Sequence, residues 1–283
     1  MINTVSRYVN PYWVLVAPFL LVVLALYLGP ILDILKLSFT DPSPGLGNYY
    51  KLYENESLIR ILWTTFRICA LTTAISVLLG YVVSYTIVHA LEGERRWMLI
   101  VILLSFWISV LVRTFAWIML LGHQGVLNNT LLALGIIKEP LALMRNEVGV
   151  LIGMVQYMIP YAVLPLLATM QGLDQRVMNA SRSLGASGWQ TFRRVYLPLT
   201  KPGIVAACAL VFIMSLGFYV TPAILGGGKV LMIAEYISVQ ILITIRWGLA
   251  AMLAALMLAG VLALLWMLSR FMSLSKAVGG DVR

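Results

Sequence analysis

Long apolar runs separated by shorter polar segments dominate the hydropathy pattern of this chain. Six of these runs reach the roughly 20 residues that a helix needs to cross a hydrocarbon core about 30 Å thick. The predicted spans cover residues 12–35, 61–90, 97–121, 148–170, 202–221 and 249–268. Lipid offers no hydrogen-bond partners to an open strand edge, so helices are the expected spanning elements. We therefore predict an all-α integral membrane protein with six transmembrane helices, built as a single transmembrane domain over residues 1–283.

Composition strengthens this prediction. Hydrophobic residues make up 61% of the chain and charged residues only 11%, and the mean hydropathy is +0.94. These values lie far outside the range of soluble domains. Arg7 precedes the first apolar run, which lacks a short core ending in a small-residue cleavage site. We therefore expect this run to be a retained helix and not a removed signal peptide.

Positive charge is distributed unevenly between the two sides that six spans define. Eleven lysines and arginines but only four acids fall on the side that holds both termini, against seven of each on the other side. Cytoplasmic segments carry the excess of basic residues, so we expect a multi-pass protein with both termini in the cytoplasm. The net charge of +9 follows from this topology and from attraction to anionic lipid, and it requires no nucleic-acid partner.

The sequence lacks the residues of the common catalytic sites. Gly226–Lys229 lacks the first glycine and the final Ser or Thr of a phosphate-binding loop, and the topology places it outside the cell. Cys69, Cys208, His89 and His123 have no partners at metal-ligand spacing. We expect no catalytic residue, no metal site and no cofactor bound by this chain. The energy for any transport would then come from another chain.

A polar, basic connection over residues 174–198 separates the fourth and fifth spans. Asp174 and Ser187 are expected to cap two short amphipathic helices, Gly185 to end the first in a left-handed conformation, and Leu197-Pro198 to end the second. This segment, here called the elbow, is suited to dock into a groove on another chain, or to lie on anionic headgroups. The pattern alone leaves both alternatives open.

The elbow resembles the "EAA" loop in permease subunits of binding-protein-dependent ABC importers. That loop reads Glu-Ala-Ala, three residues, Gly, and later Leu-Pro. Here Asn179 stands in place of the glutamate and Ser181 in place of the second alanine. The likeness extends to "GNYYKLYEN", "GVLIGMVQYMIPYAVLPLLATMQGLD" and "ILGGGKVLMIAEYISVQI", and it is strongest to spermidine/putrescine-type permeases.

The resemblance implies a subunit of the bacterial inner membrane that imports a solute by alternating access. It implies a second permease subunit, two ATPase subunits that bind ATP and Mg, and an external solute-binding protein. The elbow would be a cytoplasmic coupling element that docks on the ATPase. The residues carried over for this coupling are Asn179, Ala180, Ser181, Leu184, Gly185, Ala186, Trp189, Phe192, Arg193, Leu197 and Pro198.

The candidate translocation path consists of polar and aromatic residues of the third, fourth and fifth spans, because interrupted helices with such groups near the midplane are where transporters handle their solutes. Ordinary helix packing and an interfacial aromatic belt remain the alternative explanation. Arg113 either snorkels to the outer surface or faces protein or water. The candidates are Trp107, Arg113, Trp117, Gln156, Tyr157, Pro160, Phe218 and Tyr219.

The solute is the least constrained expectation. The resemblance implies a polyamine or a similar amino compound, yet the spans supply aromatic side chains and almost no acids, and Arg113 would repel a cation. An ATP-independent channel or facilitator is the second hypothesis, and a membrane-embedded enzyme is a distant third.

Overall fold

The computed structural model describes residues 11–278, with side chains from residue 16 to residue 270. This part of the chain contains helices and no strand, which confirms the predicted all-α fold class. Two compact units divide it. The smaller unit holds the residues up to Asn55 together with Ile237–Leu258, and the larger unit holds Glu56–Tyr236 and the residues from Ala259 onward.

The smaller unit contains α1 (Pro11–Thr40) and α2 (Gly47–Glu54). The turn between them is held by side chains: Asn48 donates to the backbone oxygen of Asp41 at 2.6 Å, and Phe39 stacks on Tyr49 at 5.0 Å between ring centroids. The Asp41 carboxylate accepts a hydrogen bond at 2.6 Å from the backbone of Gly248, which lies in the first turn of α14 (Trp247–Val278). This fixes the start of the last long helix against the turn.

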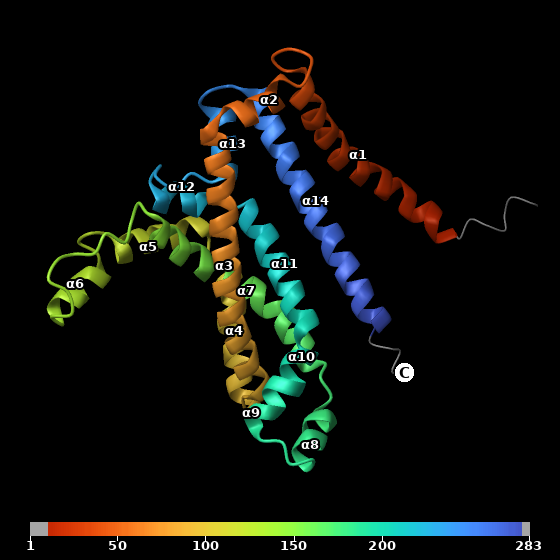
Figure 1. Cartoon of the computed structure of the whole chain (residues 1–283), viewed down its shortest axis with the longest axis vertical. Helices are drawn as coiled ribbons and strands as arrows, with labels where there is room; N and C mark the ends of the chain where they lie inside the picture. Colours follow the sequence, from red (N-terminus) through yellow and green to blue (C-terminus); the bar gives the residue numbers. More distant parts are fainter. Residues whose placement is uncertain (1–10, 279–283) are drawn as a thin grey trace, which may run out of the picture. The chain divides into compact units, whose positions relative to one another are not determined.

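The larger unit is a helical bundle followed by the elbow. Its elements are α3 (Glu56–His89), α4 (Glu92–Trp107), α5 (Val110–Leu121), α6 (Val126–Ala133), α7 (Glu147–Gln171), α8 (Gln175–Ser183), α9 (Gly188–Thr191), the π-helix η1 (Phe192–Tyr196), α10 (Leu197–Leu199), α11 (Lys201–Leu216) and α12 (Val220–Gly226). Helices α3, α7 and α11 lie side by side at its centre (Figure 1). Helix α13 (Ile233–Leu242) follows, and α13 and α14 each have residues in both units.

Small residues bring the central helices close together. A Cβ added to Gly80 of α3 would lie 2.8 Å from the Cβ of Ala162 in α7, and one added to Gly203 of α11 would lie 2.6 Å from Oγ1 of Thr169. Ser84 of α3 donates across this contact to the backbone oxygen of Val163 at 3.3 Å. Close backbone approach and interhelical hydrogen bonds are the usual means of association when lipid removes the hydrophobic driving force.

The third predicted span is wrong as a single helix. Helix α4 ends at Trp107 and α5 begins at Val110, because Ile108 is extended and Ser109 has a non-helical backbone conformation. Figure 1 shows α5 and α6 turning away from α4, and the apolar stretch long enough to span begins only after the break, over Val110–Ala133. Neither proline nor glycine marks this break, so the apolar pattern over 97–121 could not reveal it.

The fifth predicted span also ends earlier than expected. Helix α11 stops at Leu216, before Gly217, and its 16 residues measure only about 24 Å. It reaches spanning length only with the preceding helical stretch Gly188–Leu199, to which it is bent by 58°. The described residues therefore contain five helices able to span, or six if this bent pair is one span.

Charges in the larger unit separate toward the two ends of α3. The C-terminal end of α3 lies beside the start of α4 and the elbow (Figure 1). These two segments carry six arginines: Arg95, Arg96, Arg176, Arg182, Arg193 and Arg194. Toward its other end, Arg67 of α3 pairs with Glu147 at the start of α7. Which end faces the cytoplasm stays a prediction, and Arg7 and Arg283, which contributed to it, lie outside the described residues, as do both termini.

Burial places one carboxyl of this unit in an unfavourable setting. Glu235 in α13, outside the helices long enough to span, is buried, and its Oε2 has no hydrogen-bond partner. Desolvation raises the pKa of this carboxyl above its usual value, so the folded state favours the neutral form. Folding therefore becomes less favourable as the pH rises through the unfolded-state pKa near 4.5.

We therefore expect Glu235→Gln to raise the melting temperature of the detergent-solubilised protein at pH 8. The gain should shrink as the pH falls toward 4.5, where the wild-type carboxyl also becomes neutral. Melting curves at several pH values check this. Glu139→Gln, at an exposed position, serves as the control. A gain of equal size at every pH would contradict the assignment to burial of charge.

Candidate functional site

The first half of the elbow ends in a glycine-based helix cap. Asp174 caps α8 by accepting from the backbone of Arg176 at 2.8 Å. At the other end Gly185 has a φ of +84°, its N–H donates to the Arg182 oxygen at 2.9 Å, and the Ala186 N–H donates to the Ser181 oxygen at 3.2 Å. This pair of bonds is a Schellman motif, which requires the left-handed residue that glycine adopts without strain. The expected roles of Asp174 and Gly185 are thus confirmed.

The second half begins with the expected cap and ends one residue after the expected stop. Ser187 and Gln190 form a capping box with reciprocal bonds of 3.3 and 2.9 Å. Leu197-Pro198 was expected to end this helix; the helical stretch ends at Leu199 and the chain bends at Thr200. Phe192–Tyr196 is a π-helix in which the Leu197 N–H reaches back to the Phe192 oxygen. In this wider turn an N–H bonds to the oxygen five residues earlier and not four. The change of register comes directly before Pro198, which has no N–H to donate.

Aromatic contacts anchor the elbow to the C-terminal end of α3. Tyr196 is buried and meets Tyr85 at 5.3 Å and His89 at 5.9 Å between ring centroids. Phe192 packs edge-on against Tyr85 at 5.9 Å, and Trp189 stacks on Phe192 at 5.7 Å. The elbow is therefore packed directly against the C-terminal end of α3. The sequence reasoning missed Tyr85 and Tyr196, because their meeting joins segments more than 100 residues apart.

Ser181, one of the two departures from the family pattern, acts inside the elbow. Its hydroxyl lies 3.0 Å from that of Thr191, which ties α8 to α9. An alanine could not make this bond, so the serine adds a hydrogen bond across the bend. Asn179, the other departure, is exposed to solvent, and the structure gives its side chain no role inside the elbow.

The outward face of the elbow is both apolar and basic. Leu184 is 88% exposed and Trp189 68% exposed, although both are large and hydrophobic. Asn179, Ala180, Gly185, Arg193 and Pro198 are exposed as well, whereas Ser181, Ala186, Phe192 and Leu197 are half-buried. Exposed apolar side chains rimmed by arginines are typical of a surface that another protein covers.

The structure brings together part of the candidate path. The Arg113 guanidinium of α5 lies over the Tyr157 ring of α7, with Cζ 5.0 Å from the ring centroid. Tyr157 contacts Phe218, in the link between α11 and α12, at 4.5 Å between centroids. Arg113 therefore faces an aromatic ring within the bundle. It donates at 3.0 Å to the Ile108 oxygen, which the break before α5 leaves free.

Two further rings extend this contact. Tyr161 follows Tyr157 by one helical turn at 5.8 Å, and Phe106 near the end of α4 meets Tyr161 at 5.0 Å. We call Phe106, Tyr157, Tyr161 and Phe218 the aromatic cluster. The i,i+4 spacing of the two tyrosines was visible in the sequence. The position of Phe106 depends on how α4 packs and was not.

The other candidates differ in their surroundings. Pro160 lines the same small pocket as Arg113 and Tyr157, but Trp107 is 88% exposed and Tyr219 is 47% exposed. Trp117 packs against the hydrophobic core around Met154 and Val150. Gln156 has a buried Oε1 without a hydrogen-bond partner. Packing thus unites half of the predicted path and assigns Trp117 to the core.

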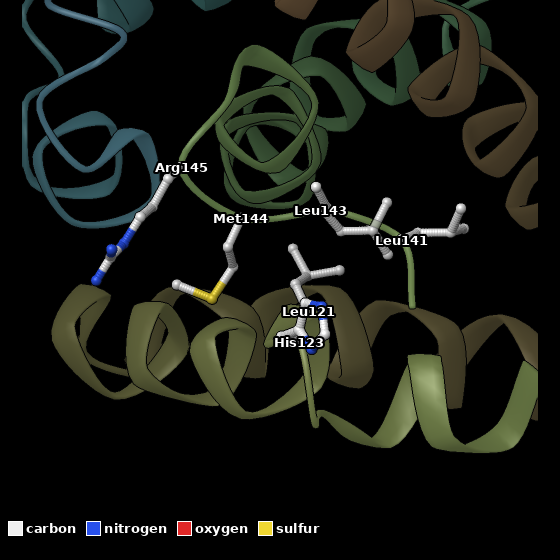
Figure 2. A pocket seen from close by; sticks show the side chains of 7 residues that line it. Leu121, His123, Leu141, Leu143, Met144 and Arg145 are labelled. Atoms are coloured by element: carbon white, nitrogen blue, oxygen red, sulfur yellow. The ribbon is translucent and has the colours of Figure 1, made fainter. Parts of the chain in front are cut away.

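A larger pocket opens elsewhere in the same unit. It has a volume of about 330 Å³ and lies between the end of α5 and residues 141–145 (Figure 2). Asn128 fixes the position of Leu141, one of the lining residues: its side chain donates to the backbone oxygens of Gly122 and Leu141 and accepts from the Leu141 N–H. The lining is Leu121, His123, Leu141, Ala142, Leu143, Met144 and Arg145. It contains the cation Arg145, neither a carboxylate nor a Phe, Tyr or Trp ring, and none of the predicted path residues.

Comparison with known families gives a match over most of the chain. Residues 94–273 match the model described as "binding-protein-dependent transport system inner membrane component". The spermidine/putrescine transport system permease protein PotB of Haemophilus influenzae is 34% identical over 71% of this chain and 70% of its own length. The PotB protein of Escherichia coli is 32% identical over 84% of this chain and 86% of its own length.

Solved structures support the fold. A chain of a bacterial alginate ABC transporter, crystallised with a periplasmic protein bound to an alginate pentasaccharide, gives a TM-score of 0.74. That match covers 94% of this chain and 95% of the other at 18% identity. Similarity at this level of identity concerns the arrangement of helices and not the solute.

Proposed function

Because this chain belongs to the family of binding-protein-dependent ABC importer permeases, we propose that it imports a polyamine or a similar small amino compound. The PotB relatives, which are named for spermidine and putrescine transport, support this choice of solute. The aromatic cluster supports it as well, because aromatic faces attract organic cations. As a transport subunit, the chain would hydrolyse no ATP and bind no cofactor. ATP and Mg would be bound by a partner.

The proposed assembly contains a second permease subunit, two ATPase subunits and an external binding protein. The elbow would dock on one ATPase, with Leu184 and Trp189 entering a groove and the arginines at its rim. The observation that carries this proposal is the exposure of two large apolar side chains on a rigidly capped, basic elbow. Closure of the ATPases would move the elbow, and the anchor of Tyr196 on Tyr85 would pass that movement to α3.

Coupling to ATP distinguishes this proposal from an ATP-independent facilitator. We expect the complete assembly in proteoliposomes to take up putrescine only with ATP, the binding protein and an active ATPase. An ATPase variant that binds ATP but cannot hydrolyse it should reduce uptake to the level of empty liposomes. Uptake indifferent to that variant would contradict the coupling. If putrescine is not taken up, the assay is repeated with a binding protein that carries another solute. ATP-dependent uptake of that solute would mean that the proposed solute is wrong and the proposed mechanism is right.

A further inference from the structure

Among the described residues that line the pocket at the aromatic cluster, Arg113 is the one charged residue, and its hydrogen-bonding groups are incompletely satisfied. Within the described residues it pairs with no carboxylate. Its Nε is buried without a hydrogen-bond partner, and a hydrogen bond to the Ile108 oxygen holds the guanidinium. A guanidinium can donate five hydrogen bonds, so this position satisfies a minor part of its capacity. Such a group can be displaced at low cost.

The position that Arg113 occupies is one that a primary ammonium group would favour. A cation within about 6 Å of a ring centroid is attracted to the face of the ring, most strongly when water is excluded. Tyr157 offers this face, and Phe218 and Tyr161 flank it at 4.5 and 5.8 Å. Since no carboxylate lines the pocket beside it, ring faces are the means by which the cluster can bind a cation.

The pocket beside Tyr157 is too small to hold the Arg113 guanidinium and a bound solute at the same time, so one cation would have to replace the other. The pocket lined by Ser105, Phe106, Arg113, Tyr157, Pro160 and Tyr161 has a volume of about 20 Å³. That is room for one group of the size of a water molecule. An ammonium head group is of this size, but the carbon chain behind it is not accommodated while Arg113 is in place.

We propose that Arg113 is a resident substitute for the ammonium group of the solute: it covers the Tyr157 ring in this conformation, and an incoming primary ammonium group takes its place. This inference rests on the proposed import of an amino compound. It explains why an arginine lies in the path of a cation, because the arginine withdraws when the solute binds. Its withdrawal also frees the Ile108 oxygen, so binding at the cluster acts on the break between α4 and α5.

The test measures direct binding of radiolabelled putrescine to the purified complete assembly, without the binding protein and without ATP. Arg113→Gln removes the competing cation, and we expect it to bind putrescine about tenfold more tightly than wild type. Arg113→Lys keeps a cation and should show no gain. Arg113→Met keeps an unbranched, flexible side chain without charge and replaces Arg113→Gln if that variant is unstable.

Variants of Tyr157 show whether the tighter binding of putrescine depends on the aromatic ring or only on the loss of the repelling charge of Arg113. The gain of Arg113→Gln should survive Tyr157→Phe, which keeps the ring, and vanish with Tyr157→Leu. No gain in either neutral variant, or a gain that persists with Tyr157→Leu, would overturn the inference. The proposed solute fails separately, by absence of ATP-driven putrescine uptake in wild type, because the binding measurement requires no transport.

Discussion

Replacing Gly185 by valine is expected to reduce ATP-driven uptake at least about tenfold while the protein still inserts and assembles its bundle. Gly185 has a φ of +84°, and an added Cβ would meet no atom within 4 Å. The penalty therefore comes from backbone conformation and not from crowding. A left-handed L-residue costs about 1–2 kcal/mol, and a β-branched one is an outlier there. Relief of this strain would open the Schellman motif and change the angle between α8 and α9.

Gly188, three residues further on, provides a matched control. It is also exposed with no atom within 4 Å of an added Cβ, but its φ lies outside the left-handed region. Gly188→Val should therefore leave uptake close to wild type. Uptake measured in proteoliposomes, with membrane insertion checked by blotting, decides the question. Wild-type uptake by Gly185→Val would show that the bend is not the coupling element.

The second large effect is expected at the contact between α3 and α7. Gly80→Leu would place a Cβ 2.8 Å from the Cβ of Ala162 and 3.4 Å from the backbone nitrogen of Val163. Backbone cannot move aside as a flexible side chain can, so the helices must separate. Overpacking of this kind costs about 1–3 kcal/mol, which lowers a melting temperature by on the order of 5 °C. The hydrogen bond of Ser84 to Val163 would be lost in the same movement.

Gly93, in the first turn of α4, is the control for this substitution, because no atom lies within 4 Å of its added Cβ. Gly93→Leu should melt at the wild-type temperature or slightly above it, since leucine favours helix more than glycine does. Thermal melts of the detergent-solubilised proteins compare the two variants. Equal melting temperatures for Gly80→Leu and wild type would mean that α3 and α7 are not in close contact.

The elbow was predictable because its signals are local. A capping serine, a left-handed glycine and an apolar face each depend on residues within one or two turns, so Ser187 and Gly185 could be assigned from the sequence. The expected end at Leu197-Pro198 lies one residue before the observed end at Leu199, so this signal was local as well. The π-turn over Phe192–Tyr196, which precedes the proline, was not foreseen. A change in hydrogen-bond register leaves no trace in hydropathy.

The candidate path was only half predictable because its members come from four segments. The sequence identified Arg113 and Tyr157 as unusual for their position, yet their contact requires α5 to turn away from α4 at Ile108. Trp117 is, like Tyr157, an aromatic residue within an apolar span, but it packs into the core. Polarity within a span indicates that a residue has a partner or faces water, and it does not say which.

By itself the sequence determined the fold class, the approximate position of most helices, the capped elbow and the family, since these depend on hydropathy summed over whole spans and on short-range caps. Only the tertiary structure decided the break at Ile108, the anchor of Tyr196 on Tyr85 and the meeting of Arg113 with Tyr157. The physical reason is that in a chain this apolar almost every helix face can pack or meet lipid equally well. The close approach of particular backbones, as at Gly80 and Ala162, then selects one arrangement.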